Sequence, residues 1–334
     1  MTLDSDKVLL EVRNLKTYIE TSSGLVKAVD DVSFDVRKGE IVGLVGESGC
    51  GKTMAALSVM RLLPEPYGKI VGGSIYFDGQ DLTKLSEGEM RAIRGSKISI
   101  IFQDPLTALN PIMKIGEQIV EAIVSHQQVD KNEARQRAIN LLHSVGIPDG
   151  KVIANQYPFR ISGGMRQRVM IAIALACDPT LLIADEPTTN LDVSIQAQIL
   201  EVISDIRRKR GISVLLITHN LGLVAWLCDR VFVMYAGKIV EQAPTEALFT
   251  NPSHPYTELL LKSVPKLDSP KDKLATIEGE VPNLIMVPKG CRFHLRCPYA
   301  RECCRAVEPD LVKVGIDHYA RCLMQDSRYN VEWK

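Results

Sequence analysis

The sequence of 334 residues has no excess of either charge and no long hydrophobic run. Lysine and arginine together number 40, as do aspartate and glutamate, so the formal net charge is zero. A neutral chain makes a poor nucleic-acid coat, whose affinity depends on excess positive charge, and we expect no nucleic-acid partner. The longest apolar stretch, 169–177, has nine residues, whereas a membrane-spanning helix needs about 20. The N-terminus carries acids where an export signal would be basic, so we expect neither membrane spanning nor export.

Internal repeats and low-complexity tracts are also missing, and the composition, 46% hydrophobic and 24% charged, is typical of a globular protein. The length suits one large domain with an addition, or two domains. Prolines and glycines interrupt every periodic stretch between residues 265 and 290, which predicts a linker or an extended wrapping segment. We therefore expect a domain boundary between 1–264 and 265–334.

Hydrophobic periodicity predicts alternating strands and helices. Predicted strands cover 8–12, 32–36, 40–45, 181–184 and 214–217, and a further sheet segment with an Asp78-Gly79 turn covers 69–82. Predicted helices cover 52–63, 116–145, 166–177 and 193–210. The strand–helix–strand order of 181–217 implies parallel strands in an α/β core.

A glycine-rich turn after the strand 40–45 fits the pattern G-x-x-x-x-G-K-[ST]. Its glycines let backbone N–H groups surround a β-phosphate, and the following helix N-terminus adds partial positive charge. Lys52 would reach the β and γ oxygens, and Thr53 would offer its hydroxyl to Mg²⁺. An ordinary glycine-rich turn is the alternative interpretation, which the flanking strand and helix patterns disfavour. The predicted ATP-binding residues are Gly46, Glu47, Ser48, Gly49, Cys50, Gly51, Lys52, Thr53 and Met54.

Two adjacent acids end the predicted strand 181–184. Asp185 would hold Mg²⁺ at the strand end, and Glu186 could polarise the water that attacks the γ-phosphate. Strands often end in a carboxylate for solubility, so this interpretation depends on the phosphate-binding loop.

The stretch Ile161-Ser162-Gly163-Gly164-Met165 resembles the L-S-G-G-Q signature of the ABC-transporter ATPase family. Ile161 replaces leucine and Met165 replaces glutamine, both outside the Ser-Gly-Gly core. Further family motifs match in the correct order: Tyr18 the aromatic residue that stacks on adenine, Gln103 the Q-loop, Leu191-Asp192 the D-loop and His219 the switch histidine. The resemblance covers about residues 8–262. It implies an α/β fold: an ABC-type P-loop ATPase core with an antiparallel β subdomain, a helical signature subdomain at about 104–178, and a small Cys-rich C-terminal extension.

The resemblance also implies roles for these residues. Two nucleotide-binding domains would close head to tail on ATP, with Glu186, His219 and Gln103 in catalysis and Mg²⁺ bound through Thr53, Gln103 and Asp185. The residues expected to contact the ATP of the partner domain are Ser162, Gly163, Gly164, Met165 and Asp192.

Two further stretches, 108–111 and 251–257, resemble the oligopeptide/dipeptide permease branch of this family. That likeness implies an ATPase subunit lying peripherally on the cytoplasmic face of the cell membrane and energising uptake of di- or oligopeptides. Its partners would be a second ATPase subunit in a heterodimer, two integral membrane permease subunits and an extracytoplasmic solute-binding protein. The alternatives are nickel or an oligosaccharide as solute, or a soluble non-transport ABC ATPase, which would need a coiled-coil insertion or tandem halves that this length does not hold.

Five of the eight cysteines lie between residues 291 and 334. The spacing of Cys291, Cys297, Cys304 and Cys322 resembles that of the dipeptide-permease ATPase subunits and implies a [4Fe-4S] cluster, with Cys303 as an extra thiol. Zinc is the competing interpretation, disfavoured because structural zinc sites usually have one ligand pair two to four residues apart. Unliganded thiols are the third.

Overall fold

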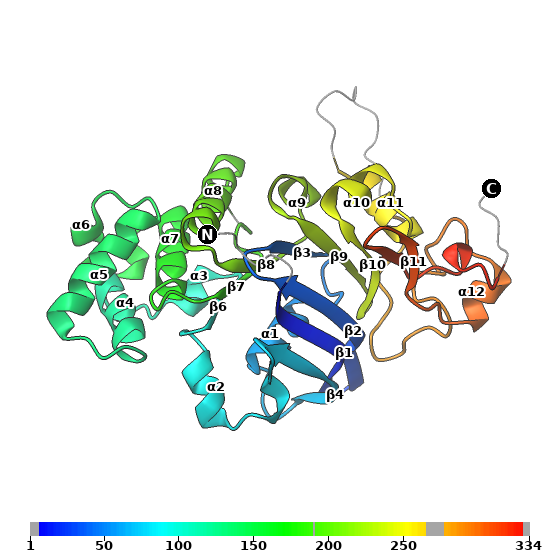
Figure 1. The fold of residues 1–334 in the computed structure, drawn as a ribbon, viewed down its shortest axis with the longest axis horizontal. Helices are drawn as coiled ribbons and strands as arrows, with labels where there is room; N and C mark the ends of the chain where they lie inside the picture. Colours follow the sequence, from blue (N-terminus) through cyan, green and yellow to red (C-terminus); the bar gives the residue numbers. More distant parts are fainter. Residues whose placement is uncertain (1–6, 190, 265–276, 330–334) are drawn as a thin grey trace. The chain divides into compact units, whose positions relative to one another are not determined.

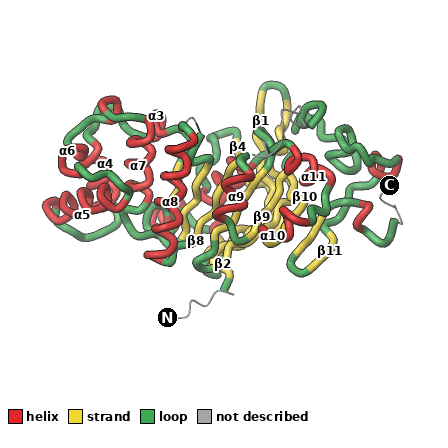
Figure 2. Tube along the Cα trace, turned by 90° about the horizontal axis from the view of Figure 1, so that it is seen from above, coloured by secondary structure: helices red, strands yellow, loops and turns green. Residues whose placement is uncertain are grey.

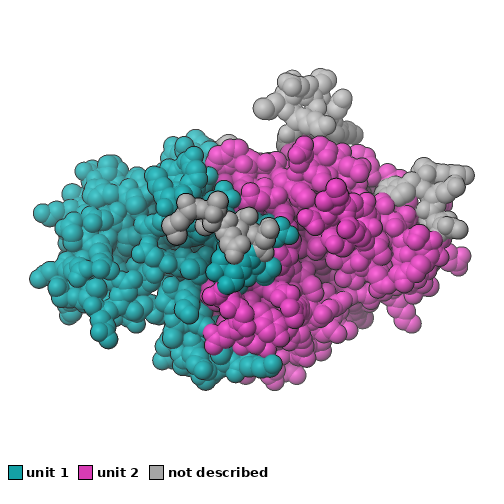
Figure 3. Space-filling view, viewed as in Figure 1, with its two compact units in different colours: residues 1–9, 36–40, 84–217 teal, residues 10–35, 41–83, 218–334 magenta. Residues whose placement is uncertain are grey.

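The computed structural model describes residues 7–189, 191–264 and 277–329, arranged in two compact units. Unit 1 comprises residues 1–9, 36–40 and 84–217, and unit 2 comprises residues 10–35, 41–83 and 218–334 (Figure 3). The predicted division into 1–264 and 265–334 is not tested by these units and stays a prediction. Residues 265–276, which follow the predicted boundary, lie outside the described residues.

Unit 1 contains three parallel strands with helices packed around them. The strands β6 (Ile98–Ile101), β7 (Leu181–Asp185) and β8 (Ser213–Thr218) pair in the order β6-β7-β8. Every residue of β7 and β8 is buried, so their apolar runs do not alternate with polar residues, as expected for strands covered on both faces. The parallel pairing confirms the α/β order predicted from the sequence.

Unit 1 contains a group of helices close together in space and one longer helix, α8. Figure 1 shows α4, α5, α6 and α7 grouped together. The helices are α2 (Glu87–Ile93), α3 (Pro105–Ala108), α4 (Ile115–Val124), α5 (Lys131–Ser144), α6 (Gly150–Ala154), α7 (Gly163–Ala174) and α8 (Val193–Arg210), with a 3-10 turn at Pro158–Arg160.

The stretch 116–145, predicted to be helical, holds two helices, because α4 ends at Val124 and α5 begins at Lys131. Asp130 causes the restart: its carboxylate accepts hydrogen bonds from the backbone N–H groups of Asn132, at 2.8 Å, and Glu133, at 3.0 Å.

Unit 2 contains an antiparallel sheet with the order β2-β1-β4-β5. A second set of strands has the order β11-β12-β10-β9-β3, in which β3 and β9 are parallel and the remaining described pairs are antiparallel. Figure 2 labels β9, β10 and β11 of this set among the strands drawn in yellow. The strands are β1 (Val8–Thr21), β2 (Gly24–Arg37), β3 (Ile41–Val45), β4 (Gly68–Phe77), β5 (Gln80–Asp81), β9 (Arg230–Tyr235), β10 (Lys238–Pro244), β11 (Val312–Gly315) and β12 (His318–Ala320).

The helices of unit 2 are short. They are α1 (Lys52–Met60), α9 (Leu221–Leu227), α10 (Thr245–Thr250), α11 (Pro255–Lys262) and α12 (Glu302–Ala306), with 3-10 turns at Leu82–Lys84 and Leu323–Gln325. Among the helices that the structure describes, none combines the length and the apolar character needed to cross a membrane.

Residues 277–329, called the C-terminal segment below, pack against the rest of unit 2. The backbone N–H of Lys27 in β2 donates to the carbonyl of Leu284 at 3.0 Å. Further along, β12 pairs with β10 through Glu241 and Ala320. The fully buried carboxylate of Glu241 also accepts a hydrogen bond from His318 Nε2 at 2.7 Å. The segment is therefore held by main-chain pairing and by a buried polar contact.

Candidate nucleotide-binding and catalytic site

The loop between β3 and α1 has the conformation that its glycines permit. Gly46 and Gly51 have φ values of 151° and 107°, which side-chain-bearing residues rarely adopt. A Cβ on Gly46 would lie 2.1 Å from the carbonyl oxygen of Met234, and one on Gly51 would lie 2.1 Å from that of Ala28. At these two glycines the loop is thus packed tightly against the backbone of neighbouring segments. At Gly49, by contrast, an added Cβ would meet no atom within 4 Å.

Lys52, the first residue of α1, has its ammonium group inside this loop. Its Nζ donates to the carbonyl oxygens of Gly46 at 2.8 Å and Glu47 at 2.9 Å, and its side chain is only 4% exposed. Cys50 is buried beside it, and burial raises the pKa of the Cys50 thiol. The neighbouring Ser48 and Thr53 are exposed, so the loop presents hydroxyl groups to solvent, whereas the Lys52 ammonium group is buried.

Glu47 is held through both its backbone and its side chain. Its backbone N–H donates to the hydroxyl oxygen of Tyr256 at 2.8 Å. Its carboxylate accepts two hydrogen bonds from the Arg296 guanidinium, at 2.7 and 2.9 Å, in a bidentate ion pair. Neither partner was predicted from the sequence as part of the site.

Tyr18 lies on β1, and its hydroxyl donates to Asp30 at 2.8 Å. Burial raises the pKa of Tyr18 to about 12, and the hydrogen bond to Asp30 adds to this. The other oxygen of Asp30 pairs with Arg292. Burial alone would raise the pKa of Asp30, but the contacts with Tyr18 and Arg292 outweigh it and lower that pKa. The ring expected to stack on adenine is thus fixed at its hydroxyl end by an ionised carboxylate.

In unit 1, the two predicted acids follow one another at the carboxyl end of β7. Asp185 is buried as the last residue of the strand. Glu186 has a φ of 45°, uncommon for a residue with a side chain, and its carboxylate oxygen Oε2 accepts hydrogen bonds from the Gln103 amide and the Thr189 hydroxyl, each at 2.9 Å. The structure therefore brings together Gln103 and Glu186, as the predicted catalytic roles require, and adds Thr189.

The predicted signature residues form the start of α7. Ser162 is the N-cap of that helix, and its hydroxyl oxygen accepts a hydrogen bond from the backbone N–H of Met165 at 3.3 Å. A Cβ on Gly164 would lie 2.9 Å from Cγ2 of Ile195 in α8, so glycine allows α7 and α8 to approach there. Asp192 is exposed and is the N-cap of α8. Within unit 1, the exposed Ser162 and the two glycines therefore form the N-terminus of α7, and Asp192 lies at the N-terminus of α8.

His219 directly follows β8 and is exposed. The next residue, Asn220, caps α9 by accepting a hydrogen bond from the Gly222 N–H at 3.0 Å. His219 therefore lies at the end of the predicted strand 214–217, as expected. The phosphate-binding loop and His219 belong to unit 2, and the Gln103–Glu186 pair belongs to unit 1.

The prediction of an iron–sulfur cluster is wrong. One cavity is lined by Cys291, Cys297, Cys304 and Cys322, together with His254, Pro255, Phe293, His294, Leu323 and Met324. Within the part of the chain that the structure describes, however, no group of three or more His, Cys, Asp or Glu side chains is arranged to hold a metal ion, and this gives the zinc alternative no support either. Burial raises the pKa of Cys291 and Cys322 to about 12 and that of Cys297 to about 11, because a buried thiolate is poorly solvated.

The contacts of Arg296, Arg292 and Tyr256 with the site were missed by sequence reasoning. Arg296 is separated from Glu47 by 249 residues, and no local pattern links the two. Tyr256 lies in the stretch 251–257, which was singled out only for its resemblance to a family branch.

Comparison with known proteins agrees with this geometry. Residues 29–189 match the family model of the ABC transporters, and residues 240–304 match that of the oligopeptide/dipeptide transporter C-terminal region. The chain is 51% identical over 318 residues to the oligopeptide transport ATP-binding protein AppD of Bacillus subtilis (strain 168), covering 95% of this chain and 97% of that protein. It is 47% identical over 314 residues to the dipeptide transport ATP-binding protein DppD of Escherichia coli (strain K12), covering 94% and 96%.

A solved structure gives the same fold. A dimeric ATP-binding cassette in a post-hydrolysis state, bound to ADP and phosphate, matches with a TM-score of 0.64 and 25% identity, covering 71% of this chain and 99% of that one. The fold predicted for the core, an ABC-type ATPase cassette, is therefore confirmed. With relatives this similar over nearly its whole length, the chain belongs to the ABC transporter ATP-binding proteins of the oligopeptide/dipeptide branch.

Proposed function

We propose that this chain is the ATP-hydrolysing subunit of an importer for di- or oligopeptides. The observation that carries the proposal is the Glu186 carboxylate, held at the carboxyl end of a buried parallel strand by Gln103 and Thr189. A carboxylate fixed in this way can accept a proton from a water molecule that attacks a phosphate. The names of the relatives supply the solute class, and they do not favour nickel, an oligosaccharide or a non-transport role.

The phosphate-binding loop supplies the other half of the chemistry. Lys52 is already inside the loop, and its ammonium group would exchange the carbonyl oxygens of Gly46 and Glu47 for phosphate oxygens. The N-terminus of α1 adds partial positive charge at the same place. His219 would contact the γ-phosphate from the end of β8.

The oxygen donors present suit Mg²⁺, which prefers hydroxyl, carboxylate and amide oxygens. Thr53, Asp185 and Gln103 would hold the ion, which when bound neutralises the charge that develops on the phosphate oxygens. The exposed helix N-terminus at Ser162, Gly163 and Gly164 would bind the ATP of a second ATPase subunit, because it can bind an anion.

A family member of this kind works on a membrane, yet none of the described helices can span one. We infer that the chain lies peripherally at the cytoplasmic face of the cell membrane, on two integral permease subunits. A second ATPase subunit and an extracytoplasmic solute-binding protein complete the proposed importer.

The substitution Glu186→Gln tests the catalytic role directly. We expect ATP hydrolysis to fall by about 10²- to 10⁴-fold, the range for loss of a general base, while ATP still binds and holds two ATPase subunits together. The measurements are phosphate release and size-exclusion chromatography with ATP. Glu201→Gln, an exposed glutamate on α8, is the matched control and should hydrolyse ATP like the wild type. Hydrolysis by Glu186→Gln at the wild-type rate would refute the role of Glu186.

A further inference from the structure

The C-terminal segment reaches the phosphate-binding loop through Arg296. This guanidinium makes the bidentate ion pair with Glu47, and its side chain is 4% exposed, against 26% for Glu47. Its remaining N–H groups donate to the carbonyl oxygens of Ile277, at 3.1 Å, and Glu278, at 2.9 Å. The Arg296 guanidinium is therefore held in position next to the loop by hydrogen bonds within its own segment.

Aromatic packing holds the segment at this place. Phe293, three residues before Arg296, packs against Tyr235 and Tyr256, with ring centroids 5.1 and 5.4 Å apart. The two tyrosines are themselves 4.6 Å apart, and Tyr256 is the residue whose hydroxyl accepts the Glu47 N–H. All three rings are fully or almost fully buried. The backbone and the carboxylate of Glu47 are thus both held by one packed cluster.

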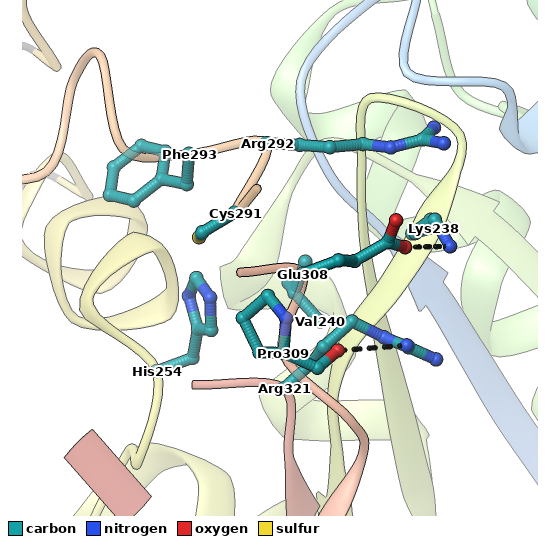
Figure 4. A pocket seen from close by; sticks show the side chains of 9 residues that line it. All are labelled: Lys238, Val240, His254, Cys291, Arg292, Phe293, Glu308, Pro309 and Arg321. Atoms are coloured by element: carbon teal, nitrogen blue, oxygen red, sulfur yellow. Dashed lines mark hydrogen bonds and ion pairs between the residues drawn. The ribbon is translucent and has the colours of Figure 1, made fainter. Parts of the chain in front are cut away.

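A second arginine of the segment extends in another direction. Figure 4 shows Arg292 pointing away from the side chains of Cys291 and Phe293. Its guanidinium pairs with Asp30, which accepts the hydroxyl hydrogen bond of Tyr18, and also donates to the carbonyl of Ala236. The segment therefore anchors two carboxylates of the candidate nucleotide site with two separate arginines.

Glu47 poses an electrostatic difficulty for a loop that binds a triphosphate. Its carbonyl oxygen lies 2.9 Å from the Lys52 ammonium, so a carboxylate is carried by the same residue that lines the phosphate cradle. A negative charge at that position would repel the phosphates of ATP. The Arg296 guanidinium neutralises this carboxylate and keeps it turned toward the C-terminal segment.

We propose that Arg296 is a positioning residue for ATP binding: by pairing with Glu47 it removes the repulsion between the loop and the phosphates and fixes the loop for them. This inference rests on the proposed function, because it deepens the account of the same nucleotide site. It gives the C-terminal segment a part in ATP binding, although the segment lies outside residues 29–189, which match the ABC transporter model.

The test uses the full chain, Mg²⁺ and a fluorescent ATP analogue, with ATP turnover measured on the same samples. For Arg296→Gln we expect the Kd for ATP to rise about tenfold, which corresponds to about 1.4 kcal/mol, while kcat at saturating ATP stays within about twofold. The rise should shrink as salt is increased, because salt screens the repulsion. Arg296→Lys keeps the charge and should bind ATP within about threefold of the wild type.

Glu47→Gln separates this role from a purely structural one. If the pair only held the segment in place, removing either partner would weaken ATP binding alike. We expect instead that Glu47→Gln binds ATP more tightly than the wild type, because the Arg296 cation is then no longer neutralised. Glu47→Gln combined with Arg296→Gln should recover most of the affinity lost in Arg296→Gln. Arg328→Gln is the matched control, since Arg328 pairs with Asp310 and Asp326 of the same segment and is 59% exposed.

Three results would overturn the proposal: unchanged ATP affinity in Arg296→Gln, equal losses in the two single variants, or no recovery in the double variant. If Arg296→Gln does not fold, the comparison of Glu47→Gln with the wild type still decides: tighter ATP binding supports the proposal, and unchanged or weaker ATP binding overturns it. A wild-type chain that neither binds nor hydrolyses ATP would contradict the proposed function itself.

Discussion

Protonation of His254 should destabilise unit 2, because this residue is buried as a neutral ring at the start of α11. It is 1% exposed, and its Nδ1 accepts a hydrogen bond from the backbone N–H of Tyr256 at 3.0 Å. A proton on Nδ1 would remove that helix cap. Two neighbouring residues also act on the ring. Glu241, which contacts His318 as well, favours the protonated ring, while Arg321 favours protonation through its backbone and opposes it through its charge. Burial dominates and lowers the pKa of His254 to about 4.

The size of the effect follows from the difference between the folded and unfolded pKa. An unfolded histidine has a pKa of about 6.5, so the unfolded chain binds the proton first as the pH falls. Stability from the neutral ring is fully present above about pH 6.5 and is lost as the pH falls toward 4. Integrating between pH 7 and pH 5 gives a loss of about 2 kcal/mol in the free energy of unfolding.

The assay is urea unfolding, followed by far-UV circular dichroism, of the wild type and His254→Asn at pH 7 and pH 5. Asparagine caps helices but does not titrate, so other ionisable groups contribute equally to both proteins. We expect the stability advantage of the wild type over His254→Asn to shrink by about 2 kcal/mol between the two pH values. An advantage that is the same at pH 7 and pH 5 would refute the reasoning.

Two further predictions concern the phosphate-binding loop. Gly51→Ala should weaken ATP binding at least tenfold in a fluorescent-nucleotide titration, since its Cβ would lie 2.1 Å from the Ala28 carbonyl oxygen. In Gly49→Ala the Cβ meets no atom within 4 Å, so this variant should lose only about 1–2 kcal/mol to the backbone strain of a left-handed residue. Equal ATP affinities in the two variants would contradict this. Cys50, buried and with a raised pKa, should react slowly with iodoacetamide in the native chain, and ATP should slow the labelling further, as mass spectrometry of the peptide would show; labelling unaffected by ATP would count against the loop geometry.

The local parts of the site were predictable from the sequence. The phosphate-binding loop is a run of eight residues whose glycines and lysine act through their own backbone and neighbours, so spacing alone identifies it. The same holds for Ser162, whose cap on α7 joins residues three apart. The N-cap Asp130, which divides the helical stretch predicted over 116–145, was present in the sequence and could have been recognised from the capping preference of aspartate.

The long-range parts were not predictable. The pairing of Arg296 with Glu47 depends on where the C-terminal segment crosses unit 2, which no periodicity encodes. The cysteine spacing led to an incorrect metal prediction for a related reason. Spacing indicated correctly that the four thiols come close together, but whether they form a ligand set depends on their orientation and burial, which only the folded chain shows.

The pairing of β12 with β10 also bears on self-association. Without the C-terminal segment, β10 would be an edge strand, and the backbone groups of Glu241 and Gln242 would be left unpaired beside a largely buried row of side chains. Such an edge is a template for pairing with another chain. In the whole protein the edge is instead β11, a strand of four residues that carries the exposed Lys313, and both features discourage such pairing. A truncated variant without the C-terminal segment would therefore expose the β10 edge, and would be prone to aggregate through β10.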